Sequence, residues 1–89
     1  MDGLARMLAA LAHAQRIRIL LKLLGGEATY RLLARTTGLE GGPLYHHLRE
    51  LRGARLIGPK VRDVYALTTR GRRAILAALA VGRLCRCSK

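Results

Sequence analysis

The chain has 89 residues, of which 17 are Lys or Arg and 5 are Asp or Glu, giving a net charge of +12. This length allows one domain, 1–89, whose core is marginal by itself, so oligomerisation would stabilise it. Because 51% of the residues are hydrophobic, the chain is not a disordered basic tail. Most of the basic residues are Arg, whose planar guanidinium suits phosphate and guanine, so the first partner to expect is nucleic acid, before anionic membrane.

Neither a membrane span nor a disulfide scaffold is expected. Basic residues interrupt the Leu-rich stretch 4–24, and the apolar run 74–82 is far shorter than the roughly 20 residues that a spanning helix needs. Cys85 and Cys87 form a CxC in a chain without a recognisable signal peptide, which fits a reducing cytoplasm. The expected location is the cytoplasm, at the nucleoid.

Two helices, or one bent helix, are predicted in the first 24 residues. Leucines at 4, 8 and 11 have helical spacing, and a second apolar register starts at Ile17. Gly25-Gly26 should end the second helix by supplying a left-handed residue. After a short extended segment 27–29, Thr29 should cap a helix over 30–37 that ends at Gly38.

The next helix begins at Gly41-Gly42-Pro43, because proline is tolerated in a first turn. Its inward stripe is Leu44, Leu48 and Leu51. The pattern then alternates around a tip at 59–63, which predicts a hairpin. Thr68 or Thr69 should cap a last helix that ends near Arg86. The expected fold is mainly α with a small β-hairpin, in the order α-α-(β)-α-α-β-β-α.

This order is that of a winged helix-turn-helix, with the helix-turn-helix at 30–53 and the wing at 56–68. In this arrangement the second helix enters the major groove while the first crosses the phosphate backbone. The outer face of the second helix suits both tasks: arginine can pair with guanine, histidine can donate or accept, and bare glycine N–H groups can seat a phosphate. The residues expected to bind DNA through this helix are Gly41, Gly42, Tyr45, His46, Arg49 and Arg52. An ordinary solvated helix carries similar residues, but the basic hairpin that follows favours DNA.

Basic residues outside that helix have weaker assignments. Lys60 and Arg62 flank the hairpin tip and are expected to contact phosphate or the minor groove, unless they only keep an exposed edge from pairing. Arg31 and Arg35 should face the DNA backbone from the preceding helix, although a solvated face explains them nearly as well. The first turn of the last helix holds three arginines that oppose the helix dipole and are expected to supply long-range attraction: Arg70, Arg72 and Arg73.

The segment 11–57 resembles the core of ArsR-like winged-helix regulators. In that family a Leu-Ala-x-x-x-Arg-x-x-Ile-Leu pattern precedes a Leu-Ala…Gly-Leu turn and a His-Leu-x-x-Leu recognition helix. A second segment, 67–72, is similar to the strand-to-helix junction of MarR-like and PadR-like relatives. The matching residues are Leu11, Ala12, Arg16, Ile19, Leu20, Leu33, Ala34, Gly38, Leu39, His47, Leu48, Leu51, Leu56 and Ile57. The resemblance implies a dimer formed by the first and last helices, 1–12 and 69–86. Apolar residues available for that interface are Leu4, Leu8, Leu11, Leu76, Leu79 and Leu84.

The chain also departs from the family. Arg55 stands where a glycine is usual, so Gly53 is expected to take the left-handed position and shorten the recognition helix. The usual metal-site motifs are missing, so neither metal nor cofactor is expected. Cys85 and Cys87 could form a thiolate or redox site across a dimer, although idle thiols in a frayed tail are favoured. His13 should cap or pack, and His47 should be half-buried with a hydrogen bond.

No nucleophile, base and orienting group can be assembled, so an enzyme is not expected. The interpretation is a homodimeric, sequence-specific regulator of transcription that binds double-stranded DNA, most simply a repressor. Two alternatives remain open: a sequence-independent DNA-coating protein, which the high charge favours, and a winged helix whose basic face binds an acidic protein.

Overall fold

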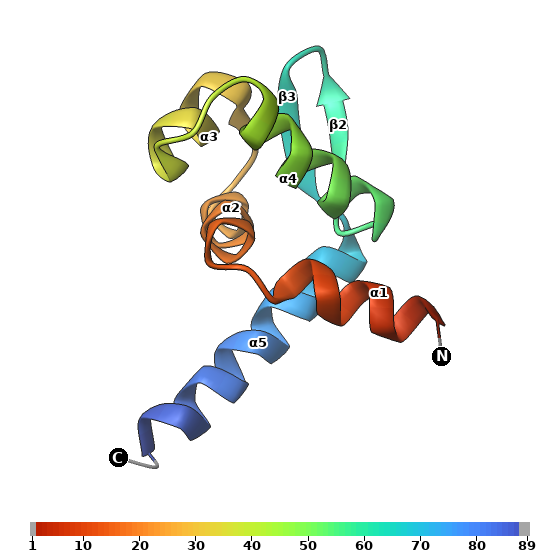
Figure 1. The fold of residues 1–89 in the computed structure, drawn as a ribbon, viewed down its shortest axis with the longest axis vertical. Helices are drawn as coiled ribbons and strands as arrows, with labels where there is room; N and C mark the ends of the chain where they lie inside the picture. The colour runs from red at the N-terminus through yellow and green to blue at the C-terminus, as the bar shows by residue number, and fades with distance from the viewer. Residues whose placement is uncertain (1, 88–89) are drawn as a thin grey trace.

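We analysed a computed structural model of the chain, in which residues 2–87 are described, without the side chains of 85–87. Within these residues the order is the predicted one (Figure 1). The elements are α1 Asp2–Leu11, α2 Ala14–Leu24, β1 Ala28–Thr29, α3 Tyr30–Thr37, α4 Gly42–Gly53, β2 Ile57–Val61, β3 Val64–Leu67 and α5 Thr69–Cys87. The winged helix-turn-helix prediction is therefore confirmed.

The first 24 residues form two helices rather than one bent helix. His13 has an extended backbone between them and its Nδ1 accepts the N–H of Gln15, so it is the N-cap of α2, as expected for a capping residue. The prediction that the glycine pair ends α2 is confirmed. Gly25 is right-handed, with φ of −81°, and Gly26 takes the positive φ of 141°. The glycine pair still ends the helix, but the second glycine makes the unusual bend.

The helix-turn-helix has the predicted caps. The Thr29 hydroxyl accepts the N–H of Leu32 at 3.1 Å, and Gly38 ends α3 with a left-handed φ of 74°. Pro43 lies in the first turn of α4. Leucines 44, 48 and 51 are all buried, so the inward stripe of α4 is confirmed.

The wing belongs to a three-stranded antiparallel sheet of order β1-β3-β2. Its turn is shorter than predicted. β2 continues to Val61, the strands are irregular between Pro59 and Val61, and only residues 62 and 63 lie between β2 and β3. Asp63 has a φ of 62°, which aspartate tolerates better than most residues. β1 pairs with β3 on the edge opposite β2 and so holds the hairpin to the body.

The prediction that Gly53 takes the left-handed position after α4 was wrong. Gly53 is still helical, Ala54 ends the helix with φ of −84°, and Arg55 itself has φ of 63°. The N–H of Leu56 then bonds to the carbonyl of Leu51 at 3.0 Å. This 6→1 bond closes a left-handed helix end of the Schellman type, and its geometry places the left-handed residue at 55 whichever side chain stands there.

The core lies among α2, α3, α4, the base of the wing and the first half of α5. Its fully buried large side chains are Ile19, Leu20, Leu23, Leu33, Leu44, Leu48, Leu51, Leu56 and Ile75. The Thr68 hydroxyl accepts the N–H of Gly71, so Thr68 caps α5. The second half of α5 extends away from the body (Figure 1). None of the described helices is both long enough and apolar enough to cross a lipid bilayer.

Candidate nucleic-acid interface

The outer face of α4 carries the predicted recognition side chains. Tyr45, His46, Arg49 and Arg52 are all exposed, while Leu44 in the same helix is completely buried. The spacing of the leucines accounts for this, since residues three and four apart share one side of a helix and leave the opposite side free. The helix thus offers two guanidinium groups, an imidazole and a phenol to a partner.

The first turn of α4 is fixed by Tyr30 at the start of α3. The Tyr30 hydroxyl accepts the N–H of Gly41 at 2.7 Å, and its ring stacks on Tyr45 with centroids 4.8 Å apart. The expectation that Gly41 offers a bare N–H to a phosphate was therefore wrong, because this donor is already used. The sequence did not predict this role of Tyr30, since the contact joins residues eleven positions apart.

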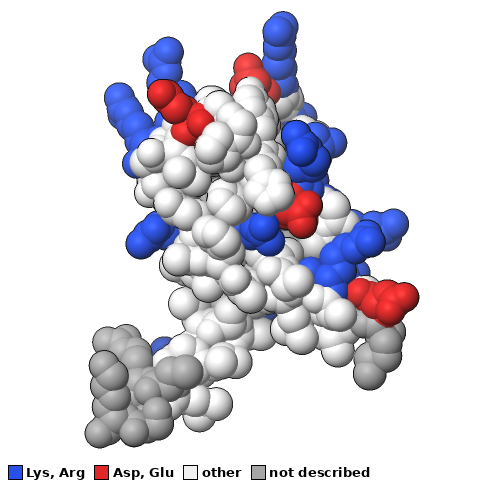
Figure 2. Space-filling model, viewed as in Figure 1, with Lys and Arg blue, Asp and Glu red and all other residues white. Residues whose placement is uncertain are grey.

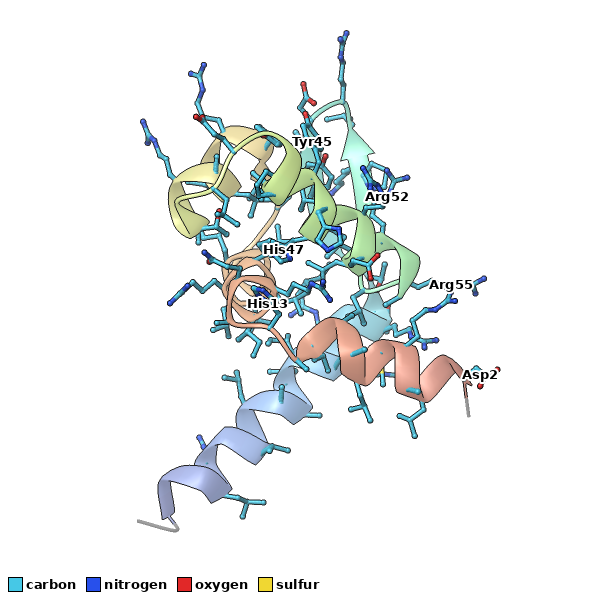
Figure 3. The ribbon with its side chains drawn as sticks, in the orientation of Figure 1. Asp2, His13, Tyr45, His47, Arg52 and Arg55 are labelled. Carbon is cyan, nitrogen blue, oxygen red and sulfur yellow. The ribbon has the colours of Figure 1, made fainter. Side chains whose placement is uncertain are left out.

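A groove of about 460 Å³ separates α4 from the wing. It is lined by Tyr45, Leu48, Arg49, Arg52, Gly53 and Tyr65. Figure 3 shows Tyr45 and Arg52 on the wing side of α4. Tyr65 was not predicted to belong here; the alternation in β3 places it with Leu67 on the side that packs against the core. Burial, with smaller contributions from Tyr45 and Asp63, raises the pKa of Tyr65 above 10, so its hydroxyl remains protonated at neutral pH.

The two basic residues predicted for the wing differ in their surroundings. Lys60 forms an ion pair with Glu27, 3.2 Å from Nζ to Oε2, in which both side chains are more than half exposed. Such an exposed pair contributes little to stability, but it partly neutralises Lys60. Arg62 lies in the two-residue turn itself and is exposed. Sequence reasoning missed the pair because β1 brings Glu27 to the wing only in the folded chain.

Positive charge surrounds this end of the molecule. Arg31 and Arg35 are exposed on α3, one turn apart, and line a hollow of about 330 Å³ with Glu40. Figure 2 shows Lys and Arg projecting from the end that carries α3 and the wing and along the adjacent side. In this view the described second half of α5 shows few charged atoms, although the start of α5 carries the exposed Arg70, Arg72 and Arg73. A concentration of positive charge around α3 and the wing is what a polyanion-binding surface requires.

α1 and α5 also expose apolar side chains. Their exposed large side chains are Leu4, Leu8, Leu76, Leu79, Val81 and Leu84. Leu11, also predicted here, is half-buried and packs against the core instead. A hollow of about 730 Å³ lies between the two helices, and its lining includes Leu4, Met7, Ala74 and Ala77 together with Arg70 and Arg73.

Three histidines gather where α2 meets α4. The His13 and His47 ring centroids are 4.4 Å apart, and those of His46 and His47 are 5.5 Å apart. His47 is 8% exposed and its Nδ1 accepts the Nε–H of Arg16 at 3.1 Å, so the predicted hydrogen bond is present and the burial is greater than expected. Within the described residues, no group of three or more His, Cys, Asp or Glu is placed to hold a metal ion. The side chains of Cys85 and Cys87 lie outside the described part of the structure.

Comparison with solved structures gives the same fold over most of the chain. The cadmium sensor CMTR from Mycobacterium tuberculosis is 39% identical, with 80% of this chain and 78% of that chain covered and a TM-score of 0.62. The homodimeric winged helix-turn-helix domain of Mb0332 from Mycobacterium bovis is 24% identical, with 92% and 80% covered and a TM-score of 0.80. The transcriptional repressor BigR from Xylella fastidiosa is 22% identical, with 93% and 86% covered and a TM-score of 0.75.

No curated protein sequence matches the chain. A family model does: the one for bacterial regulatory proteins of the arsR family matches residues 13–58, which run from the cap of α2 through the helix-turn-helix into β2. This match covers most of the segment 11–57 on which the resemblance was drawn, but not 67–72, and the family consists of regulators rather than enzymes. The chain belongs to the ArsR family of DNA-binding transcriptional regulators.

Proposed function

We propose that the chain is a homodimeric repressor that binds a palindromic operator in the cytoplasm, reading bases with α4 and contacting phosphates with the wing and α3. One observation carries the proposal. α4 exposes Tyr45, His46 and Arg49 opposite its buried leucines, beside a basic wing. A helix with such a face is the part of a helix-turn-helix that enters the major groove.

The roles of these side chains follow from their chemistry. Arg49 can donate two hydrogen bonds to guanine, and His46 can donate to or accept from a base edge. Tyr45 is held on one side by Tyr30, so its hydroxyl is presented in a fixed direction. Because the N–H of Gly41 is taken by Tyr30, Gly42 is the glycine of the pair that we assign to a phosphate.

The homodimer is supported by the apolar side formed by α1 and α5, where six large hydrophobic side chains are at least 42% exposed. Packing against a second copy would remove part of this apolar surface from water. A two-fold axis through this side would place two copies of α4 about one helical turn of DNA apart. Two proteins with this fold, the homodimeric domain of Mb0332 and the transcriptional repressor BigR, are consistent with this arrangement.

Selection of bound sequences from a random duplex pool tests the proposal. We expect recovered sequences to contain two inverted half-sites separated by about 10 base pairs between centres, and the best one to compete about 10³-fold better than random duplex. Recovery of unrelated sequences would instead favour a sequence-independent DNA-coating protein, the alternative that the net charge of +12 supports. Undetectable duplex binding at low salt would turn the assignment towards an acidic protein partner.

A further inference from the structure

The contact between α2 and α4 includes a hydrogen bond whose acceptor is a histidine nitrogen. The Arg16 guanidinium donates through Nε to His47 Nδ1 at 3.1 Å, and through Nη1 to the carbonyl oxygen of Ala9 in α1 at 3.4 Å. Arg16 therefore joins the end of α1, in the proposed dimer interface, to the middle of the recognition helix. Figure 3 shows His47 and His13 facing each other between α4 and α2.

From this geometry we propose that Arg16 and His47 position α4 relative to α1, and that protonation of His47 breaks this link and weakens operator binding in acid. The inference rests on the proposed sequence-specific function. Arg16 remains protonated at any relevant pH and is only a donor. The contact therefore exists only while His47 Nδ1 keeps its lone pair.

Protonation of His47 replaces a hydrogen bond by repulsion. The Nδ1–H of a protonated imidazole would point at the Nε–H of Arg16, with two positive charges in direct contact. The added charge would also lie next to the ring of His13, whose own Nδ1 is occupied in capping α2. The titratable or charged side chains acting on His47 are His13 and Arg16 from α2 and its start, and His46 on its own helix. All three disfavour a positive charge, and no carboxylate is among them.

Acid should destabilise the folded arrangement around His47. Burial, followed by His13, Arg16 and His46, lowers the pKa of His47 from its usual 6.5. The unfolded chain then binds the proton more tightly than the folded chain, so the folded arrangement is at full stability above pH 6.5 and loses stability as the pH falls through the lowered pKa. The same argument applies to a DNA-bound form that needs the contact.

Simple electrostatics predicts the opposite sign. Each proton added to a histidine raises the net charge, and added positive charge strengthens binding to phosphate. Acid should therefore leave binding to random duplex unchanged or tighter, whereas the proposed release of α4 weakens operator binding. The ratio of the two affinities isolates the positioning effect.

The experiment uses the full chain and its selected operator, at constant ionic strength from pH 7.5 to 5.5. We expect the operator-to-random affinity ratio of the wild type to fall about fivefold or more. His47→Asn keeps an acceptor oxygen near the Nδ1 position but cannot be protonated, so its ratio should be independent of pH. His46→Asn removes the exposed histidine that the proposed function assigns to the operator, so its affinities should differ from those of the wild type. A fall of the ratio in acid should remain, because the bond between Arg16 and His47 is untouched. A constant wild-type ratio, or a His47→Asn profile that follows the wild type, would overturn the proposal.

A second measurement covers the case in which His47→Asn does not fold or no operator is found. In the wild-type protein, NMR should show the α4 amide shifts titrating with the same midpoint as the His47 imidazole, below 6.5. Failure to find any preferred duplex at pH 7.5 counts against the proposed function, while α4 amides that do not follow His47 count against the link itself.

Discussion

Gly71 lies directly against the main chain of Leu56. A β-carbon at position 71 would overlap the Leu56 carbonyl oxygen and would lie 2.8 Å from its carbonyl carbon. The same carbonyl oxygen accepts the N–H of Thr68 at 3.1 Å, and the Thr68 hydroxyl donates to the carbonyl of Arg55 at 2.7 Å. The start of α5 is thus bonded to the segment that joins α4 to the wing, at a separation that only glycine permits.

Gly71→Ala should therefore destabilise the protein by about 3 kcal/mol, the upper end of the range for overpacking, because the obstacle is backbone and cannot rotate away. Gly82→Ala is the matched control, since it makes the same change in the same helix where a β-carbon meets nothing within 4 Å. This control should gain about 0.5–1 kcal/mol from helix propensity. Chemical unfolding at one fixed protein concentration measures both; equal effects would refute the close approach.

Arg55→Gly should stabilise the chain by about 0.5–1 kcal/mol. A left-handed conformation costs a non-glycine residue roughly 1–2 kcal/mol, and the added freedom of glycine in the unfolded chain removes about 0.5–1 of that gain. Arg55 has φ of 63° and is exposed, so little packing is lost. Gly53→Ala, on the helical residue two positions earlier, should not be harmful. A loss of stability in Arg55→Gly would show that the guanidinium makes a contact that outweighs the backbone strain.

Tyr30→Phe should cost about 0.5–1.5 kcal/mol, because the N–H of Gly41 loses its acceptor while the ring stack is retained. Operator affinity should fall further than random-duplex affinity, since the first turn of α4 is no longer tied to α3. Tyr45→Phe is the control for stability: its hydroxyl makes no hydrogen bond to another described residue, so unfolding should be nearly unchanged. The stability prediction fails if the two variants unfold alike.

The sequence predicted the element order, the caps at Thr29 and Gly38 and the buried leucines of α4, because all of these depend on residues close together in the chain. It failed where distant residues meet. The bond from Gly41 to Tyr30, the ion pair of Lys60 with Glu27 and the approach of Gly71 to Leu56 each need the folded chain. Arg55 is a different case. The sequence identified position 55 as the usual glycine position after the recognition helix, but the expectation that Gly53 would take the left-handed conformation in place of Arg55 was wrong.

Leu79→Glu tests the proposed dimer. Leu79 is 42% exposed, and a charge there would be buried without a partner if α5 packs against a second copy. Sedimentation should show the variant as a monomer at concentrations where the wild type is a dimer, with weaker binding to a full palindrome and unchanged binding to a half-site. Leu21→Glu is a control of similar exposure, 40%, on α2, and should remain dimeric. Monomeric wild-type protein at micromolar concentration would contradict the dimer directly.

Arg49 and Arg62 should differ in what they contribute to DNA binding. If Arg49 pairs with a guanine, Arg49→Ala should cost about 1–3 kcal/mol against the operator and relax selection at that one base pair. Arg62, in the turn of the wing, is assigned to phosphate, so Arg62→Ala should weaken operator and random duplex by similar factors and reduce the slope of log affinity against log salt by about 1. Titrations of both duplexes at several salt concentrations distinguish the two residues. Equal losses on both duplexes for Arg49→Ala would mean that α4 does not read bases through this side chain, because a contact to a base edge cannot be made equally well on a random sequence.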